Sequence, residues 1–241
     1  RWLAGAVELV YADQQDGQDF LVVAGRDGAG RRALVTYDGY LQFTVAPEAG
    51  LIALQAIDES RAPAAQVITA AFQDDFEDVV DAIPQDELSI IATFGGEPFI
   101  LYPPTDDFTP SPVLAFYWSP DGSSLAWLLQ IDDGDGDCAS ETALYEVQFW
   151  TGDTIIAGPR FRPTATFACN YVPFFDQLDQ STSFWSPDGQ LFTFAGTDQL
   201  SGERGVWTFR PGSFESATRI AEGEIGVWSP DNAGSAGASA L

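Results

Sequence analysis

Phe116-Tyr-Trp-Ser-Pro-Asp-Gly122 is the stretch that decides the fold, because the chain of 241 residues repeats it. The further copies are Phe184-Trp-Ser-Pro-Asp-Gly189, Val227-Trp-Ser-Pro-Asp-Asn232 and, in degenerate form, Thr44-Val-Ala-Pro-Glu-Ala-Gly50. Their prolines stand at positions 47, 120, 187 and 230, so the spacings are 73, 67 and 43 residues. The shortest spacing matches the roughly 40–45 residues of one four-stranded propeller blade, and the longer ones predict blades that carry insertions.

The chemistry of the motif predicts a tight turn between two strands. Proline presets φ for the second turn position, and aspartate and glycine suit the third and fourth. β-Rich runs flank the first copy, Val113–Trp118 before it and Leu125–Leu129 after it, which is typical of a hairpin. The tryptophan before each turn offers a large apolar surface for packing between neighbouring blades. The residues to which we assign these structural roles are Trp118, Pro120, Asp121, Trp185, Pro187, Asp188, Trp228, Pro230 and Asp231.

The remaining β-rich runs are expected to complete four-stranded blades. They lie at 51–57, 88–94 and 98–102 after the degenerate copy, at 124–131, 143–150 and 154–161 after the first full copy, and at 191–195, 205–209 and 217–221 after the second. Residues 7–11, 20–24 and 33–37 predict three strands without a motif, whereas the last motif has an inner strand at 225–228 and no strand after it. We therefore expect a fourth blade in which 225–228 pairs with the N-terminal strands through 7–11, because this closure removes exposed sheet edges.

One helix is expected, inserted into the blade that follows the degenerate motif. Apolar residues at 72, 76, 79 and 83 follow helical spacing with acidic residues between them, and Pro84 ends the pattern. This periodicity predicts a short amphipathic helix from about Phe72 to Ala82 as the only substantial helix of the chain.

The repeat resembles the TolB-type propeller repeat, a relative of the WD-type repeat that is marked by Trp-Ser-Pro-Asp-Gly. The segment Phe20–Leu34 is similar to that family's third strand, its glycine-rich turn and its Arg-Arg-containing fourth strand. The resemblance implies an all-β propeller of four-stranded antiparallel blades. It gives almost no information on activity, because one fold can carry many functions. We expect four blades in one domain over residues 1–232, followed by a flexible tail of small residues over 233–241. A fragment of a larger propeller is the alternative.

The charge of the chain excludes several functions. Its 10 basic and 36 acidic residues give a formal net charge of −26, and it has neither histidine nor lysine. Such a polyanion repels phosphate backbones, so no nucleic-acid partner is expected. Without histidine and lysine there is no Ser–His–Asp triad, imidazole metal ligand, Schiff base or P-loop lysine. We therefore expect a protein that is not an enzyme.

The two cysteines, Cys138 and Cys169, give information on the cellular compartment of the protein. Either they are unrelated buried thiols or they form a disulfide that ties down two insertions of one blade, and we predict the disulfide. A cystine in a strongly acidic chain without methionine or lysine favours an extracellular, cell-surface or periplasmic protein. No run of about 18 apolar residues is present, so no membrane span is expected.

The acidic run Asp132–Asp137 is the candidate metal site. Carboxylates that alternate with glycine can wrap a hard cation such as Ca²⁺, and the candidate ligands are Asp133, Asp135, Asp137 and Glu141. The run departs from an EF-hand loop, because Cys138 occupies the glycine position and Leu144 the position of the bidentate glutamate. A solvated acidic loop without a metal is the alternative. Calcium is the one cofactor that the sequence suggests.

The candidate interaction surface consists of Tyr171, Phe174 and Phe175, in the long segment after Cys169. Aromatic residues beside acids suit contact with protein or glycan, although the same side chains could fold back over a face of the propeller. These patterns favour a non-catalytic, secreted or surface-displayed module for protein interaction or structure, with a protein or glycan partner or a place in a larger assembly. The alternative is a carboxylate-based glycan-binding or glycoside-hydrolysing propeller, with or without calcium.

Overall fold

The computed structural model describes residues 1–3, 7–58, 60, 80–102, 111–178, 181–213 and 216–229. These residues form antiparallel sheets and a few short helical turns, so the expected all-β class is confirmed. The contacts of the chain divide it into two compact units, Arg1–Pro110 and Ser111–Leu241. A single domain over 1–232 stays a prediction, and the tail expected at 233–241 lies outside the described residues.

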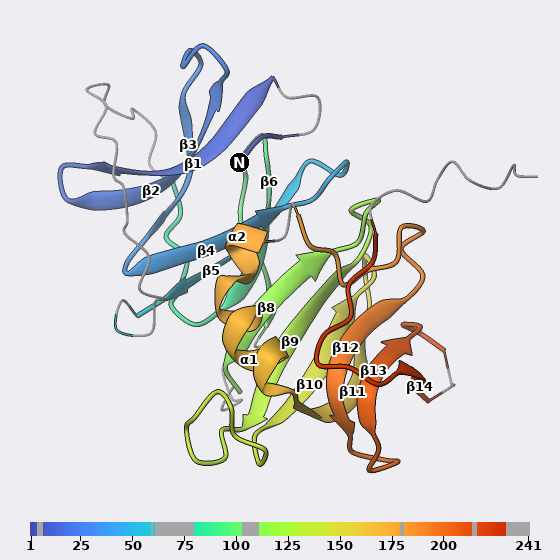
Figure 1. The fold of residues 1–241 in the computed structure, drawn as a ribbon. Coiled ribbons are helices and arrows are strands. Elements are labelled where there is room, and N and C mark those ends of the chain that lie inside the picture. The colour runs from blue at the N-terminus through green and yellow to red at the C-terminus, as the bar shows by residue number, and fades with distance from the viewer. Residues whose placement is uncertain are drawn as a thin grey trace, which may run out of the picture. The chain divides into compact units, whose positions relative to one another are not determined.

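The N-terminal unit contains two sheets (Figure 1). The first, of order β1-β2-β3, comprises β1 (Glu8–Gln15), β2 (Gln18–Gly25) and β3 (Arg32–Tyr37). The second, of order β4-β5-β6-β7, comprises β4 (Tyr40–Val45), β5 (Leu51–Ile57), β6 (Leu88–Ala92) and β7 (Phe99–Tyr102). The segment before β6 joins them, because Ala82 pairs in parallel with Thr36 of β3, and Gln85 pairs with Ala56 of β5. The two sheets therefore share one apolar core, which includes Val10, Leu21, Leu34, Leu41, Ile52, Ile83 and Ile91.

The helix expected at about 72–82 falls mostly outside the described residues. Its last three residues, 80–82, are described, and none of them is helical. Asp81 O accepts a 3.0 Å hydrogen bond from Thr36 N–H, and Ala82 forms the parallel bridge. The prediction is wrong for these three residues. Pairing with the edge of β3 satisfies backbone groups that the helical pattern alone did not reveal.

The C-terminal unit is built on one seven-stranded antiparallel sheet of order β14-β13-β12-β11-β10-β9-β8 (Figure 1, green to red). Its strands are β8 (Val113–Trp118), β9 (Leu125–Asp132), β10 (Leu144–Trp150), β11 (Ile155–Pro163), β12 (Phe192–Asp198), β13 (Arg204–Phe209) and β14 (Thr218–Ala221). β8 is the strand expected before the first full motif, and β9, β10 and β11 are the three strands expected after it. The following strands were expected in a separate blade, but β12 continues the same sheet by pairing with β11 over three residues, Phe161–Pro163 against Gly196–Asp198. The number of blades therefore stays a prediction.

The expected closure of the sheets by residues 225–228 and 7–11 is wrong. The backbone N–H of Trp228 donates to Ser183 O at 2.9 Å, and the two residues form an isolated bridge. β1 pairs with β2 on one side. On its other side, Leu9 forms a bridge with Trp2, and Val10 N–H donates to Arg1 O at 2.7 Å. At these residues, β1 therefore pairs with β2 on one edge and with residues 1 and 2 on the other. Neither edge is open to the predicted partner, residues 225–228.

The two described full motifs form the predicted turns with the same internal hydrogen bonds. Ser119 Oγ donates to Asp121 Oδ1 at 2.6 Å, and Ser186 Oγ donates to Asp188 Oδ1 at 2.5 Å. The glycine N–H closes each turn on the serine carbonyl, at 2.9 Å in the first turn and 2.8 Å in the second. The aspartates are therefore turn residues, as expected. Pro230 and Asp231 of the third motif lie outside the described residues.

A helical segment that the sequence analysis did not predict follows β11. It consists of α1 (Ala165–Asn170), the 3₁₀ turn η2 (Val172–Phe174) and α2 (Phe175–Leu178). Thr164 caps α1, since its hydroxyl accepts a 3.2 Å hydrogen bond from Phe167 N–H, which satisfies one of the N–H groups left open at a helix start. α2 packs on β8 (Figure 1). The ring centroids of Phe175 and Phe116 are 4.6 Å apart.

Candidate functional site

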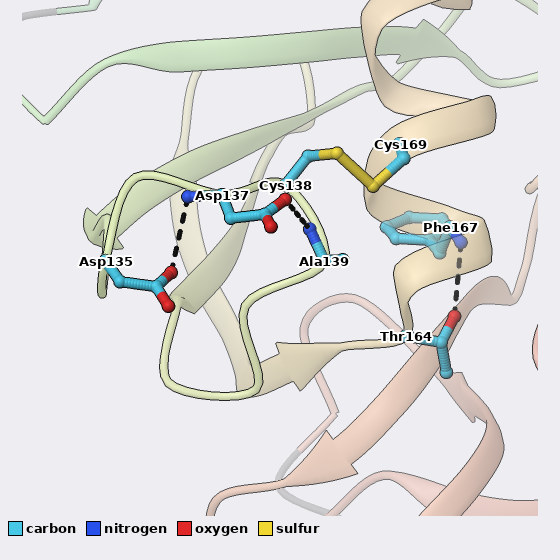
Figure 2. The surroundings of a disulfide bond; sticks show 7 residues. All are labelled: Asp135, Asp137, Cys138, Ala139, Thr164, Phe167 and Cys169. Atoms are coloured by element: carbon cyan, nitrogen blue, oxygen red, sulfur yellow. Dashed lines mark hydrogen bonds between the residues drawn. A yellow bond between two sulfur atoms is a disulfide. The ribbon is translucent and has the colours of Figure 1, made fainter.

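The predicted disulfide between Cys138 and Cys169 is present, with an S–S distance of 2.14 Å. Figure 2 shows that it joins the acidic loop between β9 and β10 to helix α1. The bond therefore anchors the two insertions that lengthen this part of the chain, which is the role expected of it.

The carboxylates of Asp135 and Asp137 are turned onto the backbone of their own loop (Figure 2). Asp135 Oδ1 accepts from Asp137 N–H at 3.3 Å, and Asp137 Oδ1 accepts from Ala139 N–H at 3.0 Å. A hydrogen bond from the Ser140 hydroxyl is the main cause that lowers the pKa of Asp135 below its usual value. In the described part of the chain no three Asp, Glu, Cys or His side chains are gathered as a metal ion would require. Calcium binding by Asp133, Asp135, Asp137 and Glu141 stays a prediction.

The three aromatic residues proposed as an interaction surface are not exposed together. Phe175 is only 1% exposed and packs edge-on against Phe116 and Tyr117. Tyr171 is half-buried beside Phe184, at 6.3 Å between ring centroids, and Phe174 is 38% exposed. An interaction surface that includes Phe175 is therefore wrong, because helix formation turns this side chain into the core of the unit.

The structure places a different candidate site, which contains charged side chains, at a hollow of about 520 Å³ on the C-terminal unit. It is lined by Ala157–Arg160, in the middle of β11, and by Ser213, Ser216 and Ala217. Asp198, Gln199 and Leu200 also line it, and Gln199 N–H donates to Arg160 O at 3.0 Å. We call this hollow the β11 groove.

An ion pair lies in the wall of the β11 groove. The Nε of Arg160 donates to Glu146 Oε2 at 2.5 Å, and the Nε2 of Gln148 donates to the other oxygen, Oε1, at 2.8 Å. The Glu146 side chain is buried and the Arg160 side chain is half exposed. Both carboxylate oxygens of Glu146 are thus held by donors, and the ion pair is electrically neutral.

Asp198 is the second buried carboxylate in the β11 groove. Its Oδ2 accepts from the backbone N–H of Ser201 at 2.8 Å and from the Ser201 hydroxyl at 2.9 Å. None of the arginines in the described ranges forms an ion pair with it. Together, Glu146, Arg160 and Asp198 give the groove one uncompensated negative charge.

The groove exists because β11 separates from β12. The two strands pair only at the end of β11, and a β-bulge interrupts the pairing of β11 with β10 near Gly158. A Cβ at Gly158 would lie 2.6 Å from the Phe149 ring and 2.9 Å from Val147 O. Glycine is therefore required for this close approach, and bulges of this kind often lie next to binding sites.

None of the three charged residues of the groove was predicted from the sequence. Counting back from the two-residue turn closed by Thr151 and Thr154 places Glu146 opposite Pro159. The bulge near Gly158 shifts the register by one residue and brings Glu146 opposite Arg160. No comparable signal exists for Asp198, because its position depends on the long-range pairing of β11 with β12.

The comparisons with known proteins concern the fold. No family model matches the chain, and no curated protein matches it. Among solved structures, the chain is similar to the tricorn protease, with 8% identity over 87% of this chain and 17% of that one and a TM-score of 0.52. It is also similar to TolB from Acinetobacter baumannii (14% identity, 89% of this chain and 41% of that one, TM-score 0.44) and to a putative TolB from Agrobacterium tumefaciens (16%, 95% and 65%, 0.42).

The chain spans less than two thirds of the length of each of the three proteins. At 8% identity, the likeness to the tricorn protease is one of fold alone. Within the described ranges, no helix is long and apolar enough to cross a membrane.

Proposed function

We propose that the chain is a non-catalytic interaction module of the TolB-like propeller kind, and that its partner binds in the β11 groove. The observation that carries this proposal is the groove itself, in which the buried carboxylates of Glu146 and Asp198 lie beside apolar residues and the 87% exposed Leu200. A hollow lined by apolar side chains together with a few fixed polar groups is typical of a binding site.

The hydrogen bonding of the groove favours binding over catalysis. The carboxylate of Glu146 is held by Arg160 and Gln148, and that of Asp198 by Ser201. A general acid or base must be free to exchange a proton with a substrate, whereas fixed carboxylates serve as recognition groups. The absence of histidine and lysine from the chain is in line with this proposal.

The disulfide supports a secreted, cell-surface or periplasmic location. The bond joins Cys138 and Cys169, and disulfides persist mainly in oxidising compartments. A partner in the same compartment, either a protein or a glycan, is therefore proposed.

A carboxylate-based glycan-binding or glycoside-hydrolysing protein is the second candidate. The observation in its favour is that two buried carboxylates, Glu146 and Asp198, line one groove, since glycosidases use such pairs. Release of reducing sugar from a panel of polysaccharides, lost in both Glu146→Gln and Asp198→Asn, would support it. If no polysaccharide of the panel releases reducing sugar, the glycoside-hydrolysing candidate is ruled out.

Site-specific photo-cross-linking tests the interaction module. A benzophenone side chain is placed at position 200, which lines the groove, and at position 94 as a control, because Phe94 of the N-terminal unit is 80% exposed and far in sequence from the groove. Irradiation with the extracellular and envelope fraction of the source should give one adduct from position 200 that position 94 does not give. The same adducts from both positions, or none from position 200, would contradict the proposal.

A further inference from the structure

Within the part of the chain that the structure describes, no strand pairs with one edge of β11 along the β11 groove. β10 pairs with β11 at Ile155, Ile156 and Ala157, whereas β12 meets β11 only from Phe161 onwards. Among the described strands, the first residues of β11 therefore have a neighbour on one side only. Such an edge is a template for another extended segment.

The turn between β10 and β11 fixes which backbone groups point to this edge. The hydrogen bond from Thr151 N–H to Thr154 O makes these two residues a hydrogen-bonded pair. Pairs alternate along an antiparallel ladder, so Ile156 exchanges hydrogen bonds with Phe149, while Ile155 and Ala157 direct their N–H and C=O groups away from β10. Ala157 lines the groove, and its outward groups face the space that an added strand would occupy.

The free edge of β11 is limited at both of its ends. The turn after Trp150 precedes Ile155, and Pro159 provides no N–H group for a ladder. The bulge near Gly158 also bends the strand there. The free edge therefore accepts a segment of about three to five extended residues rather than a long strand, which limits unspecific sheet growth.

The charge of the groove selects the kind of segment. Arg160 is neutralised by Glu146, which leaves Asp198 as a buried carboxylate without a cationic partner among the described residues. A lysine or arginine of an added strand would supply that partner. The net charge of −26 also attracts a basic segment from a distance.

We propose that β11 takes a short, extended, cationic peptide segment as an added strand, with one basic side chain directed to Asp198. This inference rests on the proposed function and names the chemistry of its partner. Backbone hydrogen bonds to Ile155 and Ala157 supply affinity, and Asp198 supplies selectivity, as in other complexes formed by strand addition.

Amide hydrogen exchange with a synthetic probe tests the backbone part. The probe is a blocked heptapeptide of alternating valine and lysine, and the control is the same peptide with glutamate in place of lysine. At saturation the lysine peptide should slow the exchange of Ile155 and Ala157 N–H at least tenfold. Ile156 N–H, which already pairs with β10, should change less than twofold. Binding without protection of Ile155 and Ala157 would overturn the proposal.

Two variants with the same loss of charge test the role of Asp198. Asp198→Asn keeps an acceptor for Ser201, and Asp133→Asn removes an exposed acid that does not line the groove. The affinity for the lysine peptide should fall at least tenfold in D198N and less than twofold in D133N. An equal loss in both would show general charge attraction only and overturn the proposal. The exchange test on the unaltered protein does not depend on how D198N folds.

Failure of this inference differs from failure of the proposed function. If position 200 cross-links a partner but the lysine peptide gives no protection, the interaction module stands and strand addition is wrong. If position 200 cross-links nothing specific, the interaction module fails, whatever the peptide does.

Discussion

The indole N–H of Trp185 donates a 3.0 Å hydrogen bond to the backbone carbonyl of Tyr117, 68 residues earlier in the chain. This bond ties the tryptophan of the second motif to the strand that leads into the first motif. The turns of the two motifs are also in contact, because a Cβ at Gly189 would lie 3.7 Å from both Ser119 Cβ and Asp121 Oδ1. The motif tryptophan therefore holds successive repeats together, beyond filling space in the core.

Trp185→Phe should destabilise the protein by about 2–4 kcal/mol, because it leaves the buried Tyr117 carbonyl without this donor and opens a cavity. Trp127 is the matched control. Both side chains are fully buried, but no group in the described part of the chain accepts a hydrogen bond from the Trp127 indole N–H. Trp127→Phe should cost about 1–2 kcal/mol less than Trp185→Phe in urea unfolding. Equal costs for the two variants would mean that the bond to Tyr117 contributes nothing measurable.

The serine of each motif should control the acidity of the motif aspartate. The Ser119 hydroxyl is the main cause that lowers the pKa of Asp121 below its usual value, and Ser186 does the same for Asp188. Since the folded-state pKa is depressed, these carboxylates stabilise the fold above the unfolded pKa, about 3.9. That stability is lost as the pH falls through the folded pKa.

NMR titration of the aspartate carboxyl carbons measures this effect. In Ser186→Ala the pKa of Asp188 should rise toward its usual value, while that of Asp121 stays low and serves as an internal control. An unchanged pKa of Asp188 would assign the depression to the Gln190 backbone N–H, which also donates to this carboxylate.

The disulfide should stabilise the C-terminal unit without forming the β11 groove. Cys138 and Cys169 are 31 residues apart, and removing a cross-link of this length costs about 3–4 kcal/mol in the chain-entropy model. Cys138→Ser with Cys169→Ser should therefore lower the free energy of unfolding by about that amount in urea titrations. Because neither cysteine lines the groove, peptide binding at low temperature should persist. Loss of binding in a still folded double variant would contradict this separation.

Local sequence patterns could predict the strands next to the motifs but not how the sheets join. Leu51–Ile57 and Val113–Trp118 form strands with the expected bounds, because turn residues delimit these β-rich runs. The pairing of β11 with β12 depends on tertiary contacts between distant segments. No local period encodes such contacts.

The candidate site was predictable only where chemistry left few choices. Two cysteines allow one disulfide, and it is present. Asp198 is one of 36 acidic residues, and nothing local distinguishes it from the others. The start of α1 had one signal in the sequence, since Thr164 follows a proline and can cap a helix start. No such signal marks α2, the helix in which Phe175 is buried.

Gly196 should be essential for the junction between β11 and β12. Its φ is not in the left-handed region, yet a Cβ there would lie only 2.2 Å from Arg162 O and 2.8 Å from the Phe161 ring. Gly196→Ala therefore has to separate the two strands, and we expect a loss of at least about 3 kcal/mol in the free energy of unfolding. Gly202→Ala is the control, because its φ of +72° is strained but no atom lies within 4 Å of the added Cβ, which predicts a loss of about 1–2 kcal/mol. Chemical denaturation of both variants measures the difference, and amide exchange at Thr197 reports whether the junction opens. A cost for Gly196→Ala no larger than that for Gly202→Ala would show that β11 and β12 do not approach each other so closely.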